Sequence, residues 1–221
     1  MNASSRARFQ LIRARDKFVL YLITPPEITD EARFFPRCEE VLKAGISVIQ
    51  YRNKEASRSR AFHRARRLRE LCHGYGALFI VNDEIDMATA AGADGVHLGQ
   101  NDFPLEMARK LAGDERIIGI STHNMMEARA AWEGGADYIG YGALFRTNSK
   151  EDAASGTLDG LREIASRISI PVIGIGGITP ENISSVAETG AAGAAVISAV
   201  WGRESVSKAV ESLASSVQTK R

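Results

Sequence analysis

The chain has 221 residues, 44% of them hydrophobic, so it can form one large domain or two small ones around a buried core. Its 28 Lys and Arg against 27 Asp and Glu give a net charge of +1, which argues against the broad basic surface of a nucleic-acid-binding protein. The two cysteines, Cys38 and Cys72, lack the spacing of a zinc site or a disulfide framework, and no apolar run is long enough for a signal segment or a membrane span. We therefore expect a cytoplasmic protein with reduced thiols, and neither a nucleic acid nor a membrane as its partner.

Short runs rich in β-branched residues alternate along the chain with segments of helical periodicity. The eight predicted strands are, in chain order, FVLYLIT (18–24), SVIQY (47–51), ALFIVN (77–82), DGVHLG (94–99), RIIGIS (116–121), DYIGYG (137–142), PVIGIG (171–176) and AAVIS (194–198). The helical segments 32–45, 59–76 and 124–135 each end on a glycine, which readily adopts the positive φ of a helix C-terminus. The pattern is that of a βα unit repeated along the whole chain.

A glycine also recurs shortly before every second predicted strand. These glycines are Gly45, Gly92, Gly135 and Gly190, separated by 47, 43 and 55 residues. So regular an array favours the α/β class and a closed (β/α)8 TIM barrel, while a doubly wound open sheet, which has the same alternation, is the alternative. Because no linker-like segment divides the chain, we predict a single barrel domain over residues 18–221, preceded by a basic extension over residues 1–17 that is poorly ordered or helical.

In such a barrel the active site lies at the carboxyl ends of the strands, where the βα loops converge. Three polar residues at the end of the second strand, Gln50, Arg52 and Lys54, are spaced two apart, which places them on one face of an extended chain. Such a face either marks a strand that reaches solvent or presents positive charge to an anion. The spacing alone leaves both interpretations open.

Two carboxylates follow neighbouring strands. Asp83 follows the third strand and Asp102 the fourth, so their side chains could converge on Mg²⁺, which prefers oxygen ligands and completes its shell with water and phosphate oxygens. The alternative is that each carboxylate caps the helix after it, and the pairing on adjacent strands weakens that alternative. With cations nearby, the pair is typical of a site for Mg²⁺ and a diphosphate.

A second anion site is predicted at the ends of the last two strands. Gly176 and Gly177 in GIGGIT permit close backbone approach, and Ile197 and Ser198 could add amides and a hydroxyl; a simple tight turn is the alternative. Lys150, in the loop after the sixth strand, either closes over the cleft or is a solvated loop lysine. Two anion sites on one rim would suit two phosphorylated substrates.

The histidines are weaker candidates. His97 lies within the fourth strand, and we interpret it as a hydrogen-bonded core residue although no partner is evident. His123, at the end of the fifth strand, is placed for proton transfer, but no acid and nucleophile accompany it.

The segments YLITP, IQYRNK, VNDEIDMATAAGADGVHLGQNDFP, IIGISTH, GADYIGYGALFRTNSKEDA and PVIGIGGITPENI run from about Tyr21 to Val200. Together they resemble the thiamine phosphate synthase family, also called thiamine-phosphate pyrophosphorylase. Its members are (β/α)8 barrels that join a hydroxymethylpyrimidine diphosphate to a thiazole phosphate, giving thiamine phosphate and pyrophosphate. The resemblance implies a transferase with Mg²⁺ as cofactor and two small molecules as substrates. We expect a dissociative, SN1-like reaction, and the oligomeric state, a homo-oligomer included, stays open.

The resemblance also implies residue roles. Arg52, Lys54, Ser121 and Lys150 would be catalytic, and Asp83 and Asp102 would bind Mg²⁺. The residues implied to bind substrate are Gln50, Tyr51, Arg52, Asn53, Lys54, Asn82, Ser121, Thr147, Asn148, Ser149, Lys150, Gly177, Ile197 and Ser198. Of these, the thiazole phosphate would be held by Thr147, Ser149, Gly177, Ile197 and Ser198.

The sequence departs from the family pattern at Ala143 and Arg146, where members usually have proline. We expect a looser loop after the sixth strand and an added charge beside the thiazole site, which bear on substrate preference. The alternative function is a thiazole tautomerase or a non-catalytic regulatory relative. A tautomerase would use His123 and tends to lack the metal pair, so the presence of Asp83 and Asp102 favours the synthase.

Overall fold

The strands of this computed structural model, which describes residues 5–15, 18–25, 27–146 and 156–218, form a single closed barrel. They are β1 (Val19–Ile23), β2 (Val48–Tyr51), β3 (Leu78–Asn82), β4 (Gly95–Leu98), β5 (Ile117–Thr122), β6 (Tyr138–Tyr141), β7 (Val172–Ile175) and β8 (Gly193–Val196). Each strand pairs in parallel with the next, and β8 pairs with β1, so the sheet has no edge. The predicted (β/α)8 barrel is confirmed, and the open sheet that stood as its alternative is excluded.

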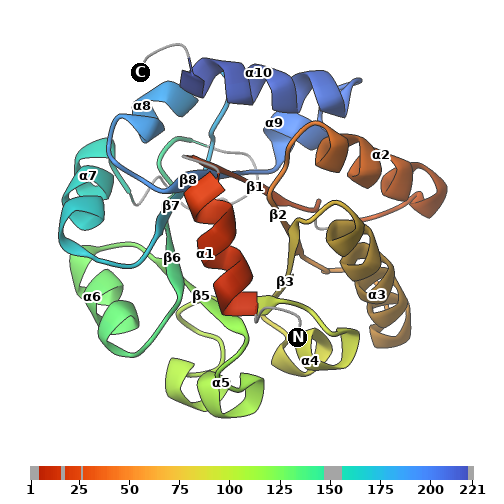
Figure 1. Cartoon of the computed structure of the whole chain (residues 1–221), viewed down its shortest axis with the longest axis horizontal. Helices are drawn as coiled ribbons and strands as arrows, with labels where there is room; N and C mark the ends of the chain where they lie inside the picture. Colours follow the sequence, from red (N-terminus) through yellow and green to blue (C-terminus); the bar gives the residue numbers. More distant parts are fainter. Residues whose placement is uncertain (1–4, 16–17, 26, 147–155, 219–221) are drawn as a thin grey trace.

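Helices surround the barrel and cover one of its ends, as Figure 1 shows. They are α1 (Ser5–Arg15), α2 (Glu31–Lys43), α3 (Arg58–Gly74), α4 (Ile85–Ala91), α5 (Leu105–Ala112), α6 (Met125–Glu133), α7 (Leu158–Arg167), α8 (Ile183–Ala187), α9 (Ser198–Trp201) and α10 (Val206–Gln218). Within the described ranges, none of these helices is both long and apolar enough to cross a membrane.

Side chains along each strand alternate between the barrel interior and the layer beneath the helices. In β2, Val48 packs with the interior cluster, whereas Ile49 and Tyr51 pack with the larger cluster between strands and helices. Gln50 has the same parity as Val48 and is 3% exposed. Parallel strands that are covered on both faces in this way consist almost entirely of apolar residues. This is why the strands could be predicted from the sequence.

The glycines of the repeat have the backbone conformation that their positions require. Gly45 and Gly135, after α2 and α6, have φ of 106° and 88°, in the left-handed region that other residues rarely enter. Gly92 after α4 and Gly190 after α8 have φ of 69° and 86°. The predicted turns before β2, β4, β6 and β8 are therefore confirmed.

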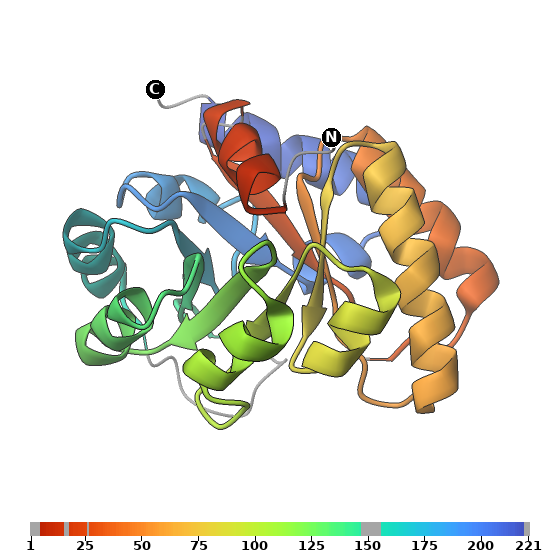
Figure 2. The same cartoon turned by 60° about the horizontal axis from the view of Figure 1, so that its bottom comes forward.

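The N-terminal helix α1 lies across one end of the barrel, as Figures 1 and 2 both show. Arg6 Nε donates to Asp137 Oδ1 at 2.5 Å, and Ser5 Oγ donates to Asp94 Oδ1 at 3.1 Å; both aspartates directly precede a strand. Phe9 is 3% exposed, and its ring centroid lies 5.6 Å from that of Tyr138 in the barrel interior. Residues 5–15 thus cover the amino-terminal end of the barrel, opposite the end where the strand-end residues gather. The domain division after residue 17 stays a prediction.

Candidate active site

The loop after β2 is held in shape by its own polar groups. Thr24 Oγ1, at the end of β1, accepts from Arg52 N at 3.0 Å and donates to Arg52 O at 3.3 Å. The Asn53 side chain donates to Ala56 O at 3.1 Å and accepts from Ala56 N at 3.0 Å. These bonds hold the backbone that carries Arg52 and Lys54, so the Asn53 amide shapes the loop.

Beside this loop lie the two predicted metal-binding carboxylates. Lys54 Nζ is 3.8 Å from Asp83 Oδ2, and Asp102 Oδ2 accepts from Gly99 N at 2.6 Å. Burial, together with the adjacent Asp102 carboxylate, raises the pKa of Asp83 to about 6, while Lys54 and Arg52 act in the opposite direction. The structure therefore brings Asp83, Asp102, Arg52 and Lys54 together, as the strand order predicted.

The capping alternative for the two carboxylates is not what the structure shows. The N-cap of α4 is Glu84 and that of α5 is Pro104, so Asp83 and Asp102 lie outside the capping positions. Asp83 moreover has φ of 64°, an uncommon conformation for a residue other than glycine and one often found at functional sites. The backbone of Asp83 is held there in part by a hydrogen bond from its amide to His97 O at 2.8 Å.

The donor set suits a hard divalent cation. Two carboxylates close enough to share a proton would be relieved of their mutual repulsion by a cation, and carboxylate oxygens are preferred ligands of Mg²⁺. In the described part of the chain, no group of three or more His, Cys, Asp or Glu side chains is arranged to hold a metal ion. A cation at Asp83 and Asp102 would therefore complete its shell with water and substrate oxygens.

Two further predicted residues, Gln50 and Ser121, are joined by hydrogen bonds through the barrel interior. Gln50 Nε2 donates to Tyr21 Oη at 2.9 Å, and Tyr21 Oη is 2.8 Å from Tyr138 Oη. His97 Nδ1 is 2.9 Å from Tyr138 Oη, and His97 Nε2 is 2.9 Å from Ser121 Oγ. His97 is hydrogen-bonded, as predicted, and its partners are the Tyr138 and Ser121 hydroxyls; its side chain is half-buried and not a fully buried core residue.

The two tyrosines of this interior line of hydrogen bonds, Tyr21 and Tyr138, are not among the predicted site residues. Tyr21 has the inward parity of β1, and Tyr138 lies opposite Gly119, where a Cβ would overlap the phenol ring. The pairing of Tyr138 on β6 with a glycine, Gly119, on the neighbouring strand β5 could have indicated that this tyrosine points into the interior. Tyr51, which is also assigned to substrate binding, is 2% exposed and its side chain packs in the outer layer, away from the interior that Gln50 lines; its assignment stays a prediction.

The predicted thiazole phosphate site lies at the ends of β7 and β8. Gly177 has φ of 62°, and a Cβ there would lie 2.7 Å from Arg146 O, so this glycine also accommodates the loop after β6. Asn182 Nδ2 donates to Gly177 O at 3.0 Å. Ile197 is half-buried and Ser198 exposed at the start of α9, whereas Asn82 is half-buried at the end of β3.

The loop after β6 is described only in part. Leu144 N donates to Ile175 O at 2.9 Å and Phe145 N to Gly176 O at 3.1 Å, so its first residues are tied to the end of β7. Thr147, Asn148, Ser149 and Lys150 lie outside the described residues. The expected loosening by Ala143 and Arg146 therefore stays a prediction.

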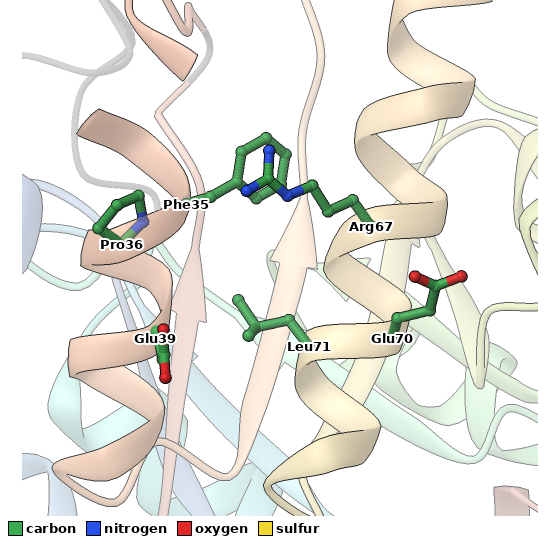
Figure 3. A pocket seen from close by; sticks show the side chains of 6 residues that line it. All are labelled: Phe35, Pro36, Glu39, Arg67, Glu70 and Leu71. Atoms are coloured by element: carbon green, nitrogen blue, oxygen red, sulfur yellow. The ribbon is translucent and has the colours of Figure 1, made fainter. Parts of the chain in front are cut away.

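A separate hollow of about 330 Å³ lies on the outside of the barrel between α2 and α3 (Figure 3). The Arg67 guanidinium stacks 3.9 Å from the centroid of the Phe35 ring, and the other lining residues are Pro36, Glu39, Glu70 and Leu71. This hollow contains none of the strand-end residues, and we do not include it in the candidate active site.

Comparison with known proteins agrees with this geometry. The family model described as "Thiamine monophosphate synthase" matches residues 20–200. The thiamine-phosphate synthase of Alkaliphilus oremlandii is 42% identical over 90% of this chain and 95% of its own, and that of Halalkalibacterium halodurans is 44% identical over 86% and 90%. The solved thiamine phosphate pyrophosphorylase of Pyrococcus furiosus superposes with a TM-score of 0.82 at 41% identity, covering 92% of this chain and 97% of its own. The chain therefore belongs to the thiamine monophosphate synthase family, whose members are transferases.

Proposed function

We propose that this chain joins 4-amino-2-methyl-5-(diphosphooxymethyl)pyrimidine to 4-methyl-5-(2-phosphooxyethyl)thiazole, giving thiamine phosphate and pyrophosphate. The observation that carries this proposal is the convergence of Asp83 and Asp102 with Arg52 and Lys54 at the carboxyl end of the barrel. Two anionic and two cationic side chains at one place suit a diphosphate bound with a divalent cation.

The proposed chemistry follows from the charge that develops. Departure of pyrophosphate leaves positive charge on the methylene carbon of the pyrimidine, which the electron-rich ring delocalises. Arg52 and Lys54 stabilise the departing negative charge, and Ser121 and Lys150 are proposed to add donors to it. The thiazole nitrogen then forms the new carbon–nitrogen bond, a step that needs no general base. Holding both substrates in line supplies the remaining rate enhancement.

Asp83 and Asp102 are the residues proposed to hold Mg²⁺. When bound, the ion would neutralise diphosphate charge and help to orient the leaving group. Gln50, Asn82 and the loop around Asn53 would position the pyrimidine diphosphate. Tyr51, whose side chain is buried in the outer layer, would contribute through its backbone. The cytoplasmic location inferred from the reduced thiols also stays a proposal.

Substitution of Arg52 tests the diphosphate site. Arg52→Ala removes a positive charge from the departing pyrophosphate, and we expect thiamine phosphate formation to fall about a hundredfold or more. Asp83→Ala should have a similar effect, because the remaining carboxylate alone binds Mg²⁺ weakly. The matched control is Arg58→Ala, since Arg58 is an exposed arginine of α3 that pairs with Asp86. Near-normal turnover of Arg52→Ala or Asp83→Ala would refute the assigned site.

Calorimetry with the thiazole phosphate tests the second site. The residues proposed for it, Thr147, Ser149, Gly177, Ile197 and Ser198, include no carboxylate, so we expect binding in EDTA as well as in Mg²⁺. Ser198→Ala should weaken this binding about tenfold through loss of a hydrogen bond to a charged group. Strict dependence of the binding on Mg²⁺ would contradict the proposed separation of the two sites.

The tautomerase alternative makes a different prediction. His123 Nδ1 lies 2.9 Å from Glu127 Oε2 in α6, the helix that begins two residues after it, so the imidazole is tied to the first turns of α6. A tautomerase would keep its activity in EDTA and lose it in His123→Ala, whereas the synthase should behave in the opposite way. A regulatory relative would bind thiazole phosphate and form no product.

A further inference from the structure

Five side chains form a continuous line of hydrogen bonds across the barrel interior. The line runs from Gln50 on β2 through Tyr21 on β1 to Tyr138 on β6, and then through His97 on β4 to Ser121 on β5. Because β1 and β6 are not neighbours in the sheet, the bond between the two phenols crosses the interior and no backbone pairing brings them together. Each of the four bonds is 2.8 or 2.9 Å long.

The Gln50 amide, which presents Nε2 to the Tyr21 hydroxyl, gives this line one direction. A phenol has one proton to donate, and Tyr21 Oη already accepts from Gln50 Nε2. Tyr21 therefore donates to Tyr138, which leaves Tyr138 to donate to His97 Nδ1. The reverse bond, from Tyr138 to Tyr21, would leave the Tyr21 proton without an acceptor among the described residues. A buried unpaired donor is costly, so the fully paired arrangement is favoured.

The same direction of hydrogen-bond donation continues from Tyr138 through His97 to Ser121, at the carboxyl end of the barrel. A neutral imidazole that accepts at Nδ1 carries its proton at Nε2, so His97 donates to Ser121 Oγ. The Ser121 hydroxyl then accepts from His97, and its own proton is free to point toward a ligand. Burial raises the pKa of both Tyr21 and Tyr138 far above the ordinary range, so both phenols keep the proton that the line requires.

We propose that Tyr21, Tyr138 and His97 are positioning residues that set the Ser121 hydroxyl as a hydrogen-bond donor to the substrate. This inference rests on the proposed function, in which the group that Ser121 meets is the departing diphosphate. A donor held in that orientation would not have to reorient as negative charge develops on the leaving group. The Gln50 amide on β2 thereby determines the direction in which the Ser121 hydroxyl, across the barrel on β5, points its proton.

The tautomer of His97 in the free protein tests the inference without any assay. In ¹⁵N spectra of the full chain, we expect the His97 proton on Nε2 and an acceptor Nδ1. The peak is assigned by its loss in His97→Asn, and the other three histidines serve as internal references. A His97 with its proton on Nδ1, or with both tautomers equally populated, would overturn the proposal.

The substitution Gln50→Glu should reverse the whole line. A carboxylate at residue 50 can only accept, so Tyr21 would donate to it, Tyr138 would donate to Tyr21, and His97 would have to donate from Nδ1. Ser121 would then donate to Nε2 and no longer to the substrate. We expect the His97 tautomer to change with this one substitution. An unchanged tautomer in a folded Gln50→Glu protein would show that the bonds do not act as a unit.

Kinetics show whether the orientation matters for the reaction. Tyr138→Phe removes the donor to His97, and we expect kcat to fall about tenfold or more while KM for the thiazole phosphate changes little. Tyr141→Phe is the matched control, because Tyr141 is also a buried tyrosine of β6 but lies in the outer layer. Its hydroxyl accepts a hydrogen bond from Thr157 N at 3.4 Å and has no part in the interior line.

A double-mutant cycle distinguishes positioning from a merely structural effect. If Tyr138 acts through Ser121, then Tyr138→Phe in a Ser121→Ala background should cost almost nothing further. Multiplicative losses in the double variant would contradict the proposal. Product formation by the unsubstituted chain tests the proposed function separately, so a wrong tautomer in an active synthase would disprove only this inference.

Discussion

At Asp83 two unfavourable features occur in one residue. Its backbone has φ of 64°, and its carboxyl group is forced toward protonation by burial and by Asp102. Either feature alone would be a modest local cost, and together they mark a position that the fold supports for a reason other than stability. A cation bound between the two carboxylates supplies such a reason.

The raised pKa gives a prediction for the pH dependence of Mg²⁺ binding. The folded pKa of about 6 exceeds the ordinary 3.8, so in the metal-free protein this group's contribution to stability is full below about 3.8 and is lost as the pH rises through about 6. Mg²⁺ must displace the proton that the pair holds at low pH. Binding should therefore be about tenfold weaker at about pH 5 than at about pH 7.5.

Calorimetric titration with MgCl₂ at the two pH values measures this difference. Asp83→Asn should abolish the pH dependence together with most of the binding. The matched control is Asp86→Asn, because Asp86 is an exposed carboxylate of α4 that pairs with Arg58. Equal affinity at both pH values in the unsubstituted protein would show that the ion displaces no proton from Asp83 between them.

At the scale of single elements, α1 is the segment whose role the sequence described least. Its arginines suggested a basic extension, yet Arg6 pairs with Asp137, which also pairs with Arg109 at 2.6 Å. Phe9 lies against Tyr138, so the helix covers the interior cluster at the amino-terminal end of the barrel. The charge of Arg6 therefore pairs with a barrel aspartate, Asp137.

The predicted consequence is that α1 stabilises the barrel without taking part in the reaction. Phe9→Ala should lower the free energy of unfolding by about 3 kcal/mol, the usual cost of truncating a buried phenylalanine, with kcat nearly unchanged. Gln10→Ala is the matched control, because Gln10 is exposed on the same helix. Urea denaturation of the two variants measures the difference, and equal midpoints would show that α1 is not packed on the barrel.

At the scale of the whole molecule, closure of the barrel depends on the pairing of its first and last strands. Gly193 at the start of β8 is opposite Val19 at the start of β1, and a Cβ at residue 193 would overlap the Val19 carbonyl oxygen. The two strands approach as closely as they do because residue 193 has no side chain.

Gly193→Ala should therefore destabilise the closed barrel by about 1–3 kcal/mol or more, as overpacking in a dense interior does. Gly74→Ala is the matched control, since a Cβ at that helical position would meet no atom within 4 Å and alanine favours helix. Thermal unfolding compares the two variants. A melting temperature for Gly193→Ala equal to that of the unsubstituted chain would mean that β1 and β8 pair differently.

Much of the fold and the position of the candidate site followed from local patterns. Every predicted strand is present, because a buried parallel strand is marked by its own apolar run, and β2, β4, β6 and β8 also by a glycine after the preceding helix. Asp83 and Asp102 could be paired in advance, because parallel strands that are neighbours in the barrel end on the same side. These inferences need only the order of the strands and the direction of the chain.

Other features could not be read from the sequence, because they depend on contacts between strands far apart in the sheet. The bond between Tyr21 and Tyr138 requires the closed interior and the space left by Gly119, and the packing of Phe9 requires the open end of the finished barrel. The sequence by itself determined which residues reach the carboxyl ends of the strands. Only the tertiary structure decided which of them share protons across the interior, because a hydrogen bond depends on distance in space and not on spacing along the chain.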